Sequence, residues 1–264
     1  MSAVPAFSPP AAANDAGAPL ASALGARVAE AVWRGTELEH RTTAARPTGW
    51  AALDAELPGG GWPEQSVVEI LAAQPAVLEW RLLSPALKTV VQNGGQVVVV
   101  GPPRQPHLPG LQYMGLSERQ FVWVQADQPA ERLWTTEQLI KSKAAGAVVA
   151  WLPKARAEQL RRLQVCAQGC ESLVFLCRPE AARHESSAAP LRVHASAGLD
   201  WTLDVHILKR RGPAHERTLA LPSIPGGLAS VLTLRARRLT RPAAEVSHAV
   251  GSPVDTVRPR HAAA

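Results

Sequence analysis

The chain has 264 residues, of which 46% are hydrophobic and 19% are charged. This composition excludes an intrinsically disordered chain and a coiled coil, and it predicts a globular body. No apolar stretch reaches the roughly 18 to 20 residues of a membrane span, and the first residues lack the pattern of a signal peptide. We therefore expect a cytoplasmic protein with no membrane contact.

The formal net charge of +6 is unevenly distributed along the chain. Residues 1–208 carry 18 Lys and Arg against 19 Asp and Glu, whereas residues 209–264 carry 10 against 3. The net positive charge is therefore C-terminal, where it could meet phosphates or an acidic protein surface.

The N-terminal part divides into three segments. Residues 1–19 are rich in Ala and Pro without any period, which predicts a disordered tail. Residues 20–38 predict a helix with one apolar stripe, and residues 39–46 predict a polar linker. Within the stripe, Leu24 and Val28 are spaced as anchors for a groove, so we expect them to contact a partner or a second copy.

Residues 47–223 alternate between short β-branched runs and helical patterns, which predicts an α/β core with a parallel sheet. The expected strands are Val67–Leu71, Gln96–Val100, Phe121–Val124, Ala147–Leu152 and Leu173–Cys177, and the expected helices are Leu78–Gln92, Leu108–Met114, Ala130–Ala144 and Ala155–Ala167. Three further strands, Leu191–Ala195, Leu199–Lys209 and Arg217–Leu221, are expected as antiparallel additions to one edge.

The turns that follow the strands lack the residues of a nucleotide site. A phosphate-binding loop needs glycines, a Lys and a Ser or Thr, but residues 72–80 contain no Gly, Lys, Ser or Thr. We expect Glu69 and Glu79 to repel a phosphate there. No acid that could orient magnesium follows the second or fourth strand. The sequence therefore predicts no catalytic residues, no bound cofactor and no enzyme activity.

Other conspicuous residues are expected to be structural. Cys166, Cys170 and Cys177 lack the spacing and the fourth ligand of a zinc site, and we expect small buried side chains. Glycines 59–61 are expected to form a tight turn. Core packing is expected for most of the tryptophans, namely Trp50, Trp62, Trp80, Trp123, Trp134 and Trp151.

Two basic clusters are the candidate contact sites. Lys209, Arg210 and Arg211 lie at the end of a predicted strand, and Arg235, Arg237, Arg238 and Arg241 lie in a Pro- and Ala-rich tail, residues 224–264. These cations could bind a protein surface or DNA, or could simply be solvated. For the tail we favour a protein, because it has few of the aromatic residues that accompany cations in single-strand binders.

One segment resembles a known superfamily. PTGWAALDAELPGGGWPEQSVVEIL, residues 47–71, is similar to the TGxxxLDxxLGGGxPxGxxxEIxG segment of RecA recombinases, and SSAAPLRVHAS and DVHILKRRGP resemble later stretches of the same fold. The resemblance covers about two thirds of the chain. Within the superfamily, residues 58–63, 101–111, 133–152, 160–164 and 208–213 are similar to the ImuA family of RecA-like, SulA-related proteins.

The resemblance implies a RecA-like parallel sheet with flanking helices, antiparallel strands at one edge and a degenerate P-loop. It also implies a non-catalytic accessory protein of SOS-induced translesion DNA synthesis in bacteria. The partners would be an ImuB-like Y-family polymerase homologue, an error-prone replicative-type polymerase and RecA, with any DNA contact indirect. Arg178 and Pro179 replace polar residues of RecA, which argues against ATP-coupled signalling.

Two alternatives remain from the same resemblance. The first is a SulA-like inhibitor that binds the bacterial division GTPase. The second is an ATP-dependent, recombinase-like DNA-binding ATPase, which the missing Lys, Thr and acidic residues oppose.

Overall fold

The computed structural model describes residues 44–224. The predicted N-terminal tail and helix, including Leu24 and Val28, lie outside the described residues. So do the arginines predicted as contacts in the C-terminal tail: Arg235, Arg237, Arg238 and Arg241.

The order of elements follows the predicted alternation closely. In chain order they are β1 (Ala45–Arg46), α4 (Ala51–Asp54), β2 (Trp62–Pro63), β3 (Val67–Ala72), α5 (Leu78–Gln92), β4 (Val97–Val100), α6 (Leu108–Tyr113), η1 (Glu118–Gln120), β5 (Phe121–Val124), α7 (Pro129–Ser142), β6 (Ala147–Trp151), α8 (Ala157–Ala167), β7 (Leu173–Pro179), η2 (Glu180–His184), β8 (Leu191–Ala197), β9 (Thr202–Lys209) and β10 (Thr218–Pro222). Because β1 lies at residues 45–46, the end of the predicted linker belongs to the folded body.

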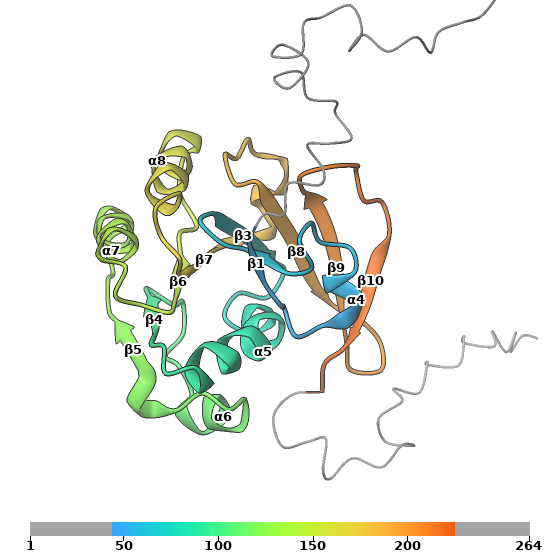
Figure 1. Cartoon of the computed structure of the whole chain (residues 1–264), viewed down its shortest axis with the longest axis horizontal. Helices are drawn as coiled ribbons and strands as arrows, with labels where there is room; N and C mark the ends of the chain where they lie inside the picture. Colours follow the sequence, from blue (N-terminus) through green and yellow to red (C-terminus); the bar gives the residue numbers. More distant parts are fainter. Residues whose placement is uncertain (1–43, 225–264) are drawn as a thin grey trace, which may run out of the picture.

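The main sheet has eight strands in the order β10-β9-β8-β3-β7-β6-β4-β5 (Figure 1). The strands from β8 to β5 in this order are parallel to one another, and β9 and β10 are antiparallel additions at one edge. The fold is therefore α/β with a mostly parallel mixed sheet.

One prediction about this edge was wrong. We expected the strand at Leu191 to be antiparallel, but β8 runs parallel to β3, with Leu191 opposite Val68. The segment between β7 and β8 returns the chain to the starting end of the sheet, as a parallel pair requires. The next strand starts at Thr202 rather than Leu199, because Asp200 and Trp201 adopt left-handed conformations in a turn.

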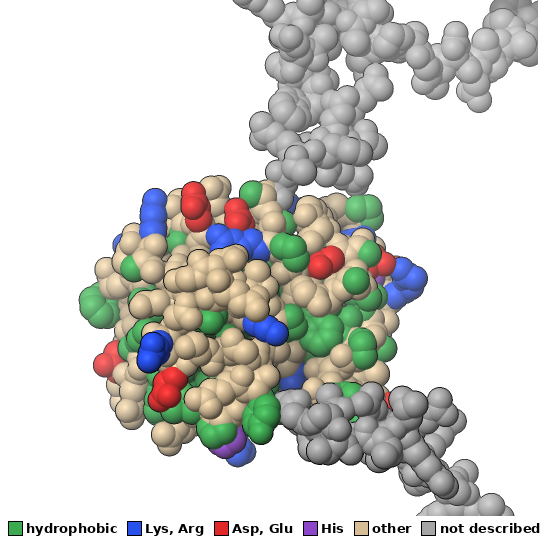
Figure 2. Space-filling model, turned by 60° about the horizontal axis from the view of Figure 1, so that its bottom comes forward, with side chains coloured by type: hydrophobic (Ala, Val, Ile, Leu, Met, Phe, Trp, Pro, Cys, Tyr) green, Lys and Arg blue, Asp and Glu red, His purple; other side chains and the backbone are tan. Residues whose placement is uncertain are grey.

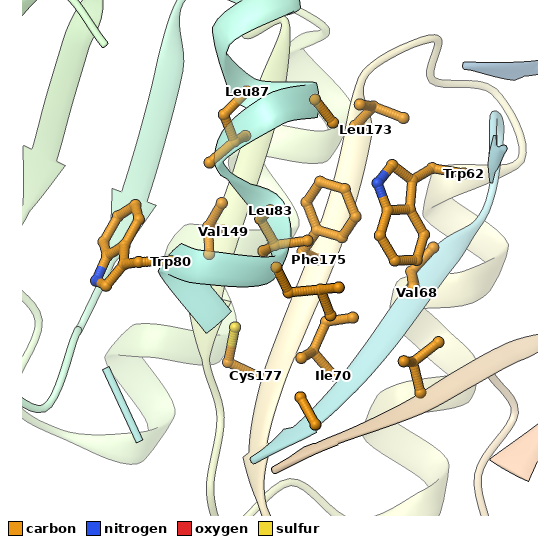
Figure 3. Packing of buried hydrophobic residues seen from close by; sticks show 14 of the residues in the cluster. Trp62, Val68, Ile70, Trp80, Leu83, Leu87, Val149, Leu173, Phe175 and Cys177 are labelled. Atoms are coloured by element: carbon orange, nitrogen blue, oxygen red, sulfur yellow. The ribbon is translucent and has the colours of Figure 1, made fainter. Parts of the chain in front are cut away.

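Helices cover both faces of the sheet. On one face α5 packs over the central strands, and Figure 3 shows Leu83 and Leu87 of this helix beside Phe175 and Val149. On the other face, Leu160 and Leu163 of α8 pack with Val67. Burying side chains of this size contributes about 1.5 to 3 kcal/mol each. The central strands are buried throughout because both their faces are covered.

The glycine turn before β3 is structural, as predicted. Gly59 and Gly60 have φ values of +80° and +76°. A Cβ on Gly61 would lie 2.1 Å from the carbonyl oxygen of Arg46, so the close pairing of β1 with β2 requires glycine there. This turn positions the strand that leads into the candidate site.

Candidate functional site at the carboxyl ends of the parallel strands

Ligands of open α/β sheets bind where the parallel strands end, and here this region lies at the ends of β3, β6 and β7. Residues 73–77 link β3 to α5 by a tight turn. The backbone amides of Val77 and Leu78 both donate to the carbonyl oxygen of Gln74, over 3.3 and 3.4 Å. These amides at the start of α5 are therefore directed to the turn itself.

A carboxylate from the chain itself occupies the start of α5. Glu79 lies in the first turn of the helix and is only 1% exposed. Its Oε1 accepts a hydrogen bond of 3.0 Å from the indole Nε1 of Trp151, at the end of β6. Its Oε2 is buried without a hydrogen-bond partner among the described residues.

Burial controls the protonation of Glu79. Desolvation raises the pKa of its carboxyl group above 4.5, although the amides of Glu79, Ala76 and Val77 and the indole of Trp151 act in the opposite direction. No salt bridge to Glu79 is found within residues 44–224. The helix N-terminus thus faces a buried acid.

Apolar groups fill the space around Glu79. The rings of Trp80 and Trp151 are 5.5 Å apart. Cys177 is fully buried, and its pKa is raised well above the usual value by burial and by the charge of Glu79. A buried thiol with a raised pKa is a poor nucleophile. Within the described part of the chain, no group of His, Cys, Asp and Glu could hold a metal ion.

The position of Glu69 differs from the prediction. Glu69 lies within β3 instead of facing the turn, and it is fully buried on the face that α8 covers. Its Oε1 accepts a bond of 2.7 Å from Arg178 Nη1, and its Oε2 accepts one of 2.5 Å from Arg192 Nε. Adjacent strands place the three side chains together, since Glu69 is in register with Arg192 and Arg178 extends from β7.

The same two arginines hold the segment after β7. Arg192 Nη2 donates to the carbonyl oxygen of Ala182 over 2.8 Å, and Arg178 Nη2 donates to Glu185 over 2.5 Å. Arg178 also donates to the carbonyl oxygen of Ala155, which precedes α8. Two buried arginines therefore hold the segment that carries η2 to the sheet, through a hydrogen bond to its backbone and an ion pair with Glu185. We call the set Glu69, Arg178 and Arg192 the buried ion-pair cluster.

The structure places the predicted basic strand end beside the glycine turn. Lys209 Nζ donates to the carbonyl oxygen of Ser187 over 2.9 Å. Arg210 donates to the carbonyl oxygens of Glu56 and Pro213, and its side chain is 16% exposed. Arg210 and Arg211 line a small pocket together with Pro58, Gly61, Pro63, Pro190 and Leu191. Lys209 and Arg210 therefore both make intramolecular contacts, and the side chains of Lys209 and Arg211 are exposed.

Sequence reasoning missed two features. The buried ion-pair cluster had a visible signal, because a single Glu interrupts the apolar strand VVEILA and an Arg occurs in each of two neighbouring strands. The other is the exposure of two tryptophans for which core packing was predicted: Trp134 is 62% exposed on α7 and Trp123 is 39% exposed on β5. Helical spacing does not show which of several apolar residues faces the sheet.

No protein-family model matches the chain, and no curated protein matches it. In the described part, no helix combines the length and the apolar character needed to cross a membrane.

Proposed function

We propose that this chain is a RecA-like protein without nucleotide chemistry, which acts by binding other proteins. The observation that carries the proposal is the position of Glu79. A phosphate-binding helix start needs free backbone amides and nearby positive charge. Here the amides of Val77 and Leu78 are bonded within the turn, and the neighbouring side chain is a carboxylate.

The fold is compatible with this proposal. A mostly parallel sheet with helices on both faces and two antiparallel edge strands is what the resemblance to RecA implies. In that resemblance the segment after β7 would correspond to a mobile DNA-binding loop. In this chain the buried ion-pair cluster fastens the segment to the sheet, which disfavours a role as a nucleotide-driven switch.

On the face drawn in Figure 2, the surface charge favours a protein partner over nucleic acid. On the face in Figure 2, Lys and Arg side chains are scattered among acidic and hydrophobic ones and form no continuous positive patch. Nucleic-acid binders that use the phosphate backbone cluster their cations. The exposed Lys209 and Arg211 remain candidates for contact with an acidic protein surface.

We further propose that the partner complex is that of SOS-induced translesion DNA synthesis. The support is the resemblance of residues 47–71 and of the later motifs to ImuA-type proteins. The proposed partners are an ImuB-like Y-family polymerase homologue, an error-prone replicative-type polymerase and RecA, and the proposed location is the cytoplasm.

The test is a pull-down with the tagged full chain from cells with damaged DNA. We expect a Y-family polymerase homologue or RecA to be captured. Capture of the division GTPase instead would support the SulA-like alternative, and capture of none of these would overturn the proposal.

A double variant, Leu24→Asp with Val28→Asp, is expected to abolish capture while the circular dichroism of the body is unchanged. Alanine at the four tail arginines, Arg235, Arg237, Arg238 and Arg241, is expected to weaken capture. Arg217→Ala is the matched control, because it also removes a cation, from a side chain that is 77% exposed and bonded to Glu56.

A further inference from the structure

A cavity of about 560 Å³ lies at the carboxyl ends of the parallel strands, where α7 and α8 begin. Its lining comes from the two segments that leave β5 and β6, within residues 127–133 and 152–159. The two helices lie on the same face of the sheet (Figure 1). A cavity of this size can hold a small ligand or a few side chains of a partner.

The sheet changes sides next to this cavity. β4 and β6 are neighbours, and the chain leaves them on opposite faces, through α6 on the side of α5 and through α8 on the other. Such a point opens a crevice at the strand ends, which is where open α/β sheets bind ligands. Arg132 of α7 lies against the end of β4, because a Cβ on Gly101 would be 2.6 Å from Arg132 Nε.

Three cations line the cavity. Arg132 Nε donates to the carbonyl oxygen of Ala126 over 2.7 Å, which fixes the direction of this side chain. Lys154 and Arg156 are exposed in the loop between β6 and α8. In the described part of the chain, none of the three cations forms a salt bridge. Asp127 also lines the cavity, so three positive charges stand against one negative charge.

The rest of the lining is largely apolar. Leu152 and Ala155 are buried, and Leu133 packs against the same core cluster. Trp134 follows the lining residue Ala130 by one helical turn on the same side of α7, and it is 62% exposed. Tryptophan is enriched at protein interfaces and among the residues that dominate their binding energy. The cavity therefore suits an occupant that combines negative charge with apolar groups.

We propose that this cavity binds a short acidic segment of a partner protein, with a carboxylate among the three cations and a neighbouring aliphatic side chain against the apolar lining. The proposal rests on the proposed function, in which the chain acts by binding proteins. Charge complementarity selects an acidic occupant, and charged hydrogen bonds to a carboxylate are the strong ones. Asp127 repels a doubly charged phosphate more than a singly charged carboxylate, and the apolar lining offers a phosphate no donors.

The experiment is a fluorescence-anisotropy titration of the full chain with a labelled synthetic peptide, Gly-Asp-Asp-Leu-Leu-Asp-Gly, at constant ionic strength. We expect saturable binding, and we expect Arg156→Glu to raise the Kd about fivefold or more, because it places a carboxylate at the cavity. Arg161→Glu is the matched control. It reverses the same charge on an exposed residue of α8 outside the lining, and it should change the Kd by less than about twofold.

The apolar part of the site is tested separately. Replacing both leucines of the peptide by Ser should weaken binding about fivefold, and Trp134→Ala should weaken it about threefold. The absence of saturable binding would overturn the proposal. So would equal effects of Arg156→Glu and Arg161→Glu, or binding that is indifferent to the leucines, because either would show general charge attraction without a site.

Competition identifies the chemistry of the occupant. Displacement of the peptide by inorganic phosphate or by a single-stranded oligonucleotide at the same ionic strength would overturn the proposal in favour of a phosphate site. Because the probe is a synthetic peptide, these results are distinct from those of the pull-down. A chain that captures no translesion partner but binds the peptide through Arg156 would refute the proposed partners and support the acidic-peptide site.

Discussion

Two buried glutamates, only ten positions apart in the chain, are accommodated in opposite ways. Glu69, on the face covered by α8, is bonded to two arginines. Glu79, on the face covered by α5, has one hydrogen bond from an indole and a pKa raised by desolvation. Burying an ionised carboxylate is costly unless it is paired, and a carboxyl group without a cation responds by holding its proton more tightly.

The two glutamates therefore lie in two different kinds of side-chain environment. The buried ion-pair cluster fastens distant segments, because each arginine also binds backbone carbonyl oxygens. The surroundings of Glu79 are largely apolar, and the rings of Trp80 and Trp151 lie 5.5 Å apart beside it. The predictions below test this contrast.

The largest effect is expected for Glu69→Gln. The change removes the negative charge and leaves Arg178 and Arg192 buried without an acid between them. Breaking a buried ion pair in this way costs about 3 to 5 kcal/mol. Urea unfolding of the full chain should show this loss in the free energy of unfolding. A loss below about 1 kcal/mol would mean that the buried ion-pair cluster does not hold these segments to the sheet.

A smaller effect is expected for Trp151→Phe, which removes the only side-chain hydrogen bond donated to Glu79 within residues 44–224. Leaving a buried carboxyl group without this donor should lower the free energy of unfolding by about 1 to 3 kcal/mol. Trp134→Phe is the matched control, because Trp134 is 62% exposed, and its effect should be within about 0.5 kcal/mol. Equal losses in the two variants would contradict the assigned role of Trp151.

The smallest effect is expected for Glu79→Gln, and its sign differs from that of Glu69→Gln. The pKa of Glu79 is raised above 4.5 in the folded state, so the folded chain binds more protons than the unfolded chain. The stabilisation that comes from the proton on Glu79 is present at low pH and is lost as the pH rises through the folded pKa. The Gln variant should therefore be as stable as the wild type or more stable at neutral pH, by about 1 kcal/mol at most.

The measurement is urea unfolding at a series of pH values from about 4 to 8. The difference in free energy between Glu79→Gln and the wild type should grow in favour of the variant as the pH rises. A variant that is destabilised at neutral pH would show that the ionised carboxylate of Glu79 stabilises the fold, in contradiction to the comparison with Glu69.

Most of the fold was predictable because its strands are short apolar runs separated by amphipathic helices. The predicted helix Leu78–Gln92 and the predicted strand Phe121–Val124 match the structure at both ends. The direction of β8 was not predictable from its own residues, since a buried strand shows the same apolar pattern in either orientation. β1 and β2 have two residues each and are too short to show any period.

The site was predictable only in part. The absence of glycine and lysine after β3 is visible in the sequence, but the roles of the two acids are not. Both lie in apolar surroundings in the sequence, and only the register of β3 with β7 and β8 brings arginines to Glu69. For Arg210, the strand-end charge suggested a partner, whereas its contact with the backbone of Glu56 depends on the folded position of the glycine turn.

The most direct test of the central claim is isothermal titration of the full chain with Mg-ATP, with and without single-stranded DNA, together with a phosphate-release assay. Because Glu79 and the rings of Trp80 and Trp151 fill the region at the start of α5, we expect no binding heat and no DNA-dependent phosphate release. Micromolar binding of Mg-ATP, or turnover stimulated by DNA, would contradict the account.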